Sequence, residues 1–385
     1  MPPGDQSPAR RVNALDAPTL PIRVPGRLDY LHGFDLMRVV AAVLVAYGHI
    51  AGWLAANEHD WAVRGFLDST VVETLRLNNL MGFTGVGTFL VISGFVITYV
   101  ATKETPGQFL LRRAFRLLPA LWLTVTLAWL LYQTSWVLHR PELGPGDLWA
   151  NLFMVNFFDD QWFTLVAVAW TLLVQFTFYL FVAATIPLGR RHPWLPPALA
   201  ISVVSVLLSL VNTTDSLATA QLRTVITFLP VVFLGQLVSL VRSGLIPVAL
   251  GTVFGILQFL LFVRAGLTNE GIPAGEAHAR TLVLVVVITV LMMGANGRLV
   301  RSSWIATAAK RTYSVFLTHI PVAYTLLGLL TPRTSLFVAL SVTVVAVVVV
   351  SELVYRLVEV PVYRWYRRRE RFGRPRTAVP GRTGT

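Results

Sequence analysis

The sequence predicts an all-α membrane protein, a polytopic bundle of about ten transmembrane helices with both termini in the cytoplasm. Three observations favour this fold. Hydrophobic residues make up 55% of the 385 residues and charged residues only 13%, and the mean hydropathy is +0.65. The hydrophobic residues form long runs, and the basic residues gather in alternate segments between those runs. Such a composition is not that of a water-soluble domain.

The hydrophobic runs can be assigned one by one, because about 17 to 25 mostly apolar residues are enough to cross a bilayer as a helix. The predicted spans are 36–55, 81–101, 117–134, 166–187, 195–212, 222–241, 245–264, 280–295, 312–330 and 335–357. No cleavable signal peptide precedes the first run, so we expect it to remain as an anchor. The stretch 146–158 is too short to span, and we expect it to be interfacial or re-entrant.

The positions of Lys and Arg predict the orientation of the spans. With the N-terminus inside, the basic residues concentrate in the cytoplasmic segments, as the positive-inside rule requires, and an even number of spans places both ends on that side. Topology and anionic lipid at the cytoplasmic face therefore account for the net charge of +13. Nucleic-acid binding is not needed to explain it. The sequence predicts a multi-pass protein of the cell membrane whose first partner is the lipid bilayer.

A single membrane domain is expected over residues 31–368. Residues 1–30 are rich in Pro and Arg and are predicted to form a disordered cytoplasmic segment, and residues 369–385 are predicted to form a basic cytoplasmic tail. The chain contains no cysteine, which excludes disulfides, a thiol nucleophile and cysteine-based metal sites. No metal site is predicted.

The first predicted helix carries polar residues where they are costly. Asp35 and Arg38 are three residues apart and can pair on one face. The step from Arg38 to His49 is close to three helical turns, so both side chains lie on one stripe, about 16 Å apart along the axis. One interpretation is structural, with an ion pair that anchors the helix end and a buried histidine bonded between helices. The functional alternative is that His49 is a general base, since neutral imidazole accepts a proton near physiological pH.

Further stretches in a fixed order carry a resemblance to a known family. They are DLMRVVAAVLVAYGH (35–49), GFTGVGTFLVISGFVIT (82–98), LLRRAFRLLPALWL (110–123), WTLLVQFTFYLF (170–181), RTYSVFLTHIPV (311–322) and VYRLVEVPVYRW (354–365). In this order they resemble the acyltransferase type 3 family of bacterial integral-membrane O-acyltransferases, which act on surface glycans or macrolide-type metabolites. The resemblance implies transfer of an acyl group, most often acetyl, from acyl-CoA to a hydroxyl group.

The resemblance also implies roles for individual residues. His49 would be the general base, and Arg38 would steer the donor or stabilise negative charge at the thioester carbonyl. Arg112, Arg113 and Arg116 match an arginine motif that would bind the acyl-CoA co-substrate, because guanidinium groups are preferred forks for phosphate. A cluster that only sets the topology is the ordinary alternative for these three residues.

Candidate supporting residues come from the other matched stretches. They are Asp35, Ser93, Trp170, Gln175, His319 and Glu359. The family usually has a glutamate where this chain has Gln175, which keeps the hydrogen bonding and loses the charge. His319 is expected either to reach the same cavity as His49 or to bond between helices. Glu359 is expected at the cytoplasmic edge, where a local salt bridge with Arg356 or Arg364 is the ordinary alternative.

The acceptor and the protein class leave alternatives open. The acceptor is a glycan, such as a lipid-linked sugar or surface polysaccharide, or else a secondary metabolite. Direct attack of the acceptor on the thioester and transfer through an acyl-enzyme both fit the residues. A transporter or polysaccharide exporter would use the same polar residues as a proton or substrate path, and inverted repeats, which would favour it, are not apparent in the sequence. An inactive relative that serves as a binding protein is the third alternative.

Overall fold

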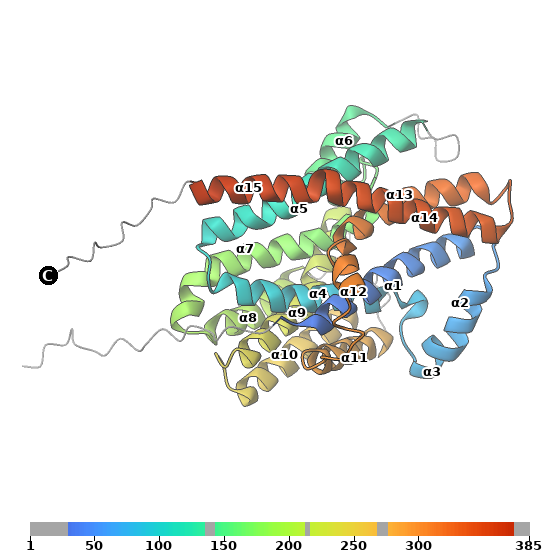
Figure 1. Ribbon diagram of the computed structural model, residues 1–385. Helices are drawn as coiled ribbons and strands as arrows, with labels where there is room; N and C mark the ends of the chain where they lie inside the picture. Colours follow the sequence, from blue (N-terminus) through green and yellow to red (C-terminus); the bar gives the residue numbers. More distant parts are fainter. Residues whose placement is uncertain (1–29, 135–142, 212–215, 268–275, 373–385) are drawn as a thin grey trace, which may run out of the picture.

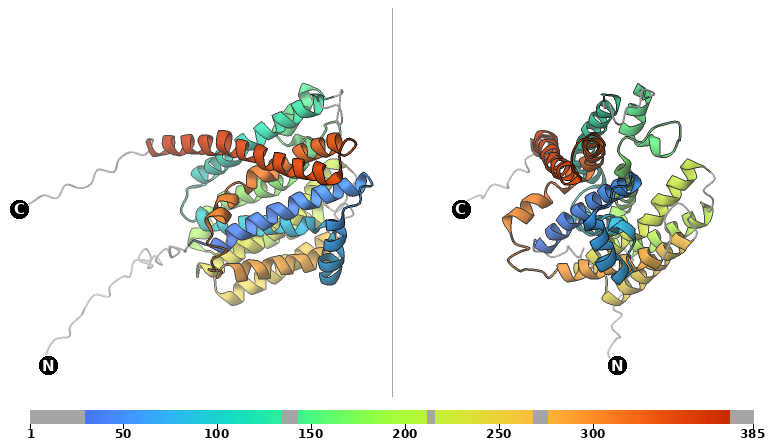
Figure 2. Two further views of the ribbon diagram at one scale, coloured as in Figure 1. Left: turned by 45° about the vertical axis from the view of Figure 1, so that its right-hand side comes forward. Right: turned by 90° about the vertical axis from the view of Figure 1, so that its right-hand side faces the viewer.

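The computed structural model describes residues 30–134, 143–211, 216–267 and 276–372, which form helices and connecting segments without a strand. The long helices lie side by side along a common direction, and short helices cap one end and one side of the bundle (Figures 1 and 2). The prediction of an all-α helix bundle is confirmed. The predicted disordered segment 1–30 lies outside the described residues apart from Tyr30, and so does the tail beyond Phe372.

Each of the ten predicted runs overlaps a helix of the structure, and several of the predicted bounds extend past the helix by up to three residues. Eight helices in the described part of the chain are long and apolar enough to cross a membrane. They are α1 (His32–Ala56), α4 (Gly82–Ala101), α5 (Pro106–Thr134), α7 (Trp170–Arg191), α9 (Leu217–Arg242), α10 (Val248–Leu267), α13 (Thr312–Leu330) and α14 (Leu336–Val354). Two shorter apolar helices, α8 (Leu195–Leu210) and α11 (Glu276–Met292), hold the other two runs.

The centre of the bundle is the crossing of α4 and α9, where two glycines let the backbones approach. A Cβ atom added to Gly94 would lie 1.9 Å from the carbonyl oxygen of Val232, and one added to Gly235 would lie 2.0 Å from that of Val91. Any larger residue at either position would force the helices apart, because small residues set how closely membrane helices pack. The glycine-rich stretch 82–98 is therefore used here for helix packing.

The last part of the chain is one long rod. Helix α14 continues through a π-helical turn, η5 (Tyr355–Glu359), into α15 (Val360–Phe372), which lies beside the first turns of α5 (Figure 1) and projects past the other helices in the left view of Figure 2. The short α12 (Ser303–Ala309) lies near the start of α1. We call the end where α1 and α5 begin and α4 ends the arginine-rich end.

Short elements occupy the opposite end. The connection between α1 and α4 forms α2 (Ala62–Leu67), η1 (Asp68–Val72), α3 (Glu73–Leu75) and η2 (Asn79–Met81), and η4 (Ala167–Ala169) leads into α7. The stretch 146–158 forms α6 (Pro145–Leu152) and η3 (Val155–Phe157). Trp122 and Trp129 of α5 donate hydrogen bonds of 3.1 Å to the carbonyl oxygens of Leu152 and Gly144, which fix α6 against α5.

Candidate active site

Helix α1 brings Asp35 and Arg38 together at the arginine-rich end. Arg38 Nη1 lies 3.3 Å from Asp35 Oδ1, and the Tyr30 hydroxyl donates to Asp35 Oδ2 at 2.5 Å. Asp35 is only 3% exposed, so these two donors satisfy a buried carboxylate. Burial, and secondarily the bond to Asp35, raise the pKa of Tyr30 to about 12, which keeps its hydroxyl a donor.

These residues line a cavity of about 230 Å³. Its walls come from α1, α4, α5, α7, α13 and η5, with the segment before α13. The charged residues that line it are Arg38, Arg113, Arg116, Lys310, Asp35 and Glu359. The uncharged polar residues include Ser93, Thr171, Gln175, Tyr179, Thr312 and Tyr313. Four cations against two carboxylates make the cavity suitable for an anion.

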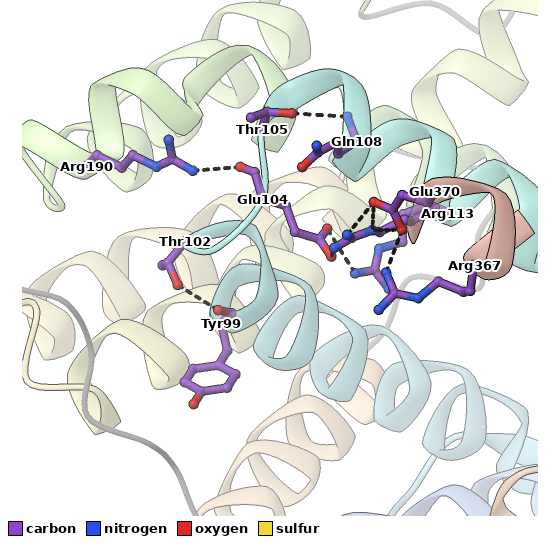
Figure 3. A network of polar contacts seen from close by, with 10 residues as sticks. Tyr99, Thr102, Glu104, Thr105, Gln108, Arg113, Arg190, Arg367 and Glu370 are labelled. Carbon is purple, nitrogen blue, oxygen red and sulfur yellow. Dashed lines mark hydrogen bonds and ion pairs between the residues drawn. The ribbon is translucent and has the colours of Figure 1, made fainter. Parts of the chain in front are cut away.

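The three arginines predicted to bind the donor do not point in one direction. Arg113, which is 8% exposed, and Arg116, which is exposed, both line the cavity. Arg112 is instead paired with Glu104 and with Glu370 of α15. Figure 3 shows Glu104 and Glu370 together with Arg113 at this end of α5. Consecutive helical residues differ by about 100° in direction, which separates Arg112 from Arg113.

Two of the residues predicted from α7 have different surroundings. Gln175 lines the cavity, and its Oε1 accepts a hydrogen bond of 3.0 Å from the Tyr179 hydroxyl one turn further on. The ring of Trp170 packs at 4.9 Å against that of Phe228 in the core between α7 and α9. Its neighbour Thr171 lines the cavity in its place.

Glu359 enters the cavity from the π-helical turn. The Ser314 hydroxyl of α13 donates a hydrogen bond of 2.9 Å to Glu359 Oε2. Arg356, the salt-bridge partner expected from the sequence, pairs with Glu352 instead. Glu352 also pairs with Arg311 at 2.5 Å. Single π-turns inside α-helices occur frequently at functional sites, and this one faces the cavity.

His49 of α1 and His319 of α13 form a pair deeper in the bundle. Their ring centroids are 5.1 Å apart in an edge-to-face arrangement, and His319 Nε2 lies 3.3 Å from His49 Nδ1. Each Nδ1 also faces the carbonyl oxygen four residues earlier, Val45 for His49 at 2.8 Å and Val315 for His319 at 3.0 Å. The Tyr324 hydroxyl donates to the carbonyl oxygen of His49 at 3.4 Å.

These contacts assign the protons of two neutral imidazoles. A carbonyl oxygen can only accept, so Nδ1 carries the proton in both rings. His319 Nε2 is then unprotonated and accepts from His49 Nδ1–H. The lone pair of His49 is left on Nε2, which is the nitrogen that can act as a base.

An aromatic pair in the cavity wall is close to one of the two histidines. Phe89 and Phe316 line the cavity, whereas neither His49 nor His319 belongs to its described wall. The two phenylalanine rings are 5.8 Å apart, and the ring of Phe316 is 6.2 Å from that of His319. Arg38 therefore lines the cavity and His49 does not, although the two were expected on one stripe of α1.

Several residues of this region were not found from the sequence. Tyr30 falls in the segment predicted to be disordered, and nothing in its composition marks it as a partner of Asp35. Glu370 is an acidic residue inside the basic run RRRER, and that reversal of sign was the available signal for an ion pair. Phe316 lies in a matched stretch but carries no polar group, so only the packing shows that it is in the cavity wall and close to His319.

Comparisons with known proteins identify relatives of the chain. The family model of an acyltransferase domain matches residues 31–356. Nodulation protein 10 of Rhizobium leguminosarum bv. viciae is 27% identical over 183 residues, which is 42% of this chain and 45% of that protein. The exopolysaccharide production protein ExoZ of Rhizobium meliloti is 26% identical over 299 residues, 74% of this chain and 90% of that protein. The first match thus spans less than half of the relative. No solved structure matches the chain.

Proposed function

We propose that this chain, which belongs to the acyltransferase type 3 family, moves an acetyl group from acetyl-CoA to a hydroxyl of a carbohydrate. The family match covers residues 31–356, and the chain is a multi-pass membrane acyltransferase. One observation carries the proposal. A cavity with four cationic side chains in its wall and a histidine whose Nδ1 faces a backbone carbonyl oxygen lie along the same helix α1, and Phe316 of the cavity wall is near the partner of that histidine. We further propose that the protein lies in the cell membrane with the arginine-rich end in the cytoplasm, where CoA is available.

The cavity is proposed to hold the phosphate-bearing part of the donor. At about 230 Å³ it is smaller than the pockets of about 300 to 1,000 Å³ that enclose drug-sized ligands, so it accommodates part of a CoA molecule. Arg113 is buried in its wall and Arg116 is exposed. Guanidinium groups at these two depths suit the phosphates of CoA, which leaves the thioester to extend further into the bundle.

His49 Nε2 is proposed to take the proton of the acceptor hydroxyl. The hydroxyl oxygen then attacks the thioester carbonyl carbon, the carbon–sulfur bond breaks, and the CoA sulfur leaves with the electron pair and takes a proton. The Val45 carbonyl oxygen holds the proton of His49 on Nδ1, with His319 Nε2 as a second, longer contact, as an orienting partner does for a general base. Transfer through an acyl-enzyme would use the same base. In both routes the Phe316 ring has to turn aside before the thioester reaches Nε2.

A carbohydrate is the proposed acceptor because of the relatives. ExoZ is named for exopolysaccharide production, and its match covers 74% of this chain. Carbohydrates present many hydroxyl groups, and one of them is the group that the base requires.

The test is to reconstitute the full chain in lipid vesicles with labelled acetyl-CoA and polysaccharide fractions. The chain contains no cysteine, so a thiol reagent reports the CoA that is released without any background from the protein. Release of CoA together with labelled polysaccharide supports the proposal. Movement of polysaccharide across the vesicle without CoA release would indicate the transporter alternative and reject the proposal.

A further inference from the structure

The C-terminal helix α15 packs against α5, which forms part of the cavity wall, although α15 falls outside the matched residues 31–356. Helix α15 is attached to α5 at two places. The rings of Tyr366 and Phe115 are stacked at 4.5 Å with an interplanar angle of 13°. One turn further on, Glu370 meets Arg112. The rod that contains α15 also carries Glu359 into the cavity.

The second attachment is a nearly buried ion network. Arg112 Nε donates to both carboxylate oxygens of Glu370, at 3.0 and 3.2 Å, and Arg367 Nη1 donates to Glu370 at 2.8 Å. Arg112 Nη1 is also bonded to Glu104. The side chains of Arg112, Glu370 and Glu104 are 13%, 12% and 6% exposed. At this burial the geometry of the network matters, because removing one partner leaves a charge without compensation.

Glu104 connects the network to the cavity. Its Oε2 lies 3.5 Å from Nη2 of Arg113, and its backbone carbonyl oxygen accepts a hydrogen bond of 2.7 Å from Arg190 (Figure 3). Arg113 lines the cavity, is 8% exposed, and its Nε has no hydrogen-bond partner among the described residues. A buried guanidinium with a free donor is suited to an anionic ligand.

We propose that Glu370 is a positioning residue for the donor: it shares Arg112 with Glu104, and this sharing leaves Glu104 able to hold Arg113 toward the cavity. Without the charge at position 370, Arg112 keeps Glu104 as its carboxylate partner and draws it away from Arg113. The guanidinium of Arg113 then loses its orientation in the cavity wall. The inference rests on the proposed function, since it takes the anion to be the CoA part of the donor. In this arrangement Arg112 holds the two carboxylates in place and does not itself contact the donor.

The experiment compares two glutamates on the same rod in the reconstituted full chain. Glu370→Gln removes the charge in the network, and Glu352→Gln removes one that pairs with Arg311 and Arg356 away from the cavity wall. We expect Glu370→Gln to weaken CoA binding and raise the KM for acetyl-CoA by about five- to tenfold with kcat within about twofold. Glu352→Gln should leave both near the wild-type values. Glu370→Asp, which keeps the charge, should recover most of the affinity.

Thermal unfolding of each variant separates positioning from folding. The inference is supported if both variants unfold at a lower temperature than the wild type and only Glu370→Gln changes the KM. An unchanged Kd for CoA in Glu370→Gln, or an equal increase in Glu352→Gln, overturns it and leaves the proposed function standing. If the wild-type chain does not bind CoA, the proposed function fails, and the positioning role fails with it.

Discussion

The cavity and the histidine pair are built in opposite ways. The cavity is an open space whose walls carry four cationic side chains and two carboxylates from several helices and connecting segments. The histidine pair is closely packed, contains two neutral rings, and its protons are fixed by backbone carbonyl groups. Binding an anionic donor needs charge, whereas removing a proton needs an uncharged nitrogen with a free lone pair. The protein places the two requirements in separate compartments.

The separation has a consequence for the reaction. In the proposed reaction, the rings of Phe89 and Phe316 at the cavity wall would keep a bound thioester from the proposed base and from the water that could hydrolyse it. Keeping a reactive group from water until the acceptor is present is a recurrent use of closed sites. Variants on either side of the phenylalanine pair therefore test different steps of one reaction.

The largest effect is expected at the base. His49→Gln keeps a polar side chain of similar size and removes the lone pair at Nε2, so kcat should fall by about 10²- to 10⁴-fold with the KM for acetyl-CoA little changed. CoA release in vesicles measures both constants. The matched control is His192→Gln, at an exposed histidine after α7, which should behave as the wild type. A wild-type kcat in His49→Gln would show that His49 is not the base.

The next effect is expected in the cavity. Arg113→Ala removes a guanidinium from its wall, and we expect the KM for acetyl-CoA to rise by about ten- to 150-fold, because a hydrogen bond to a charged group contributes about 1.5 to 3 kcal/mol. Arg191→Ala, at an exposed arginine at the same end of the bundle, is the control. A fall in kcat at unchanged KM would mean that Arg113 acts on the transition state, and the separation of roles would be wrong.

A smaller effect is expected at the Phe89–Phe316 pair, where the substitution should increase a side reaction, the hydrolysis of acetyl-CoA. Phe316→Leu shortens the ring that divides the compartments, so hydrolysis of acetyl-CoA without acceptor should rise by about threefold to tenfold, while transfer to the acceptor changes less. Phe316→Leu is preferred to Phe316→Ala, since deleting a buried phenylalanine costs about 3 to 5 kcal/mol. Phe337→Leu, at a residue that is 80% exposed, is the control. Unchanged hydrolysis would indicate that the ring does not act as the barrier.

The sequence predicted the fold better than the connections within the site. Runs of apolar residues are a local property, and all ten overlap helices of the structure. The polar residues of the cavity were also found, because Asp35, Arg38, Arg113 and Arg116 stand out in apolar surroundings. The division of the arginine motif could not be predicted, since it depends on Glu370, which is far away along the chain and reaches Arg112 only through the fold. The barrier at Phe316 was missed for the same reason.

The smallest effect is expected at Gln175, where the family usually has a glutamate. Gln175→Glu keeps the oxygen that accepts from the Tyr179 hydroxyl, and it adds a negative charge to a cavity that contains Arg113 and Arg116. The new carboxylate competes with the donor for those guanidinium groups, so the KM for acetyl-CoA should rise by about two- to threefold with kcat unchanged. Gln161→Glu places the same charge at an exposed residue outside the cavity wall and serves as the control. An increase in kcat of about tenfold or more would instead mean that a carboxylate at position 175 assists His49 across the phenylalanine pair, and the two compartments would then act as one site.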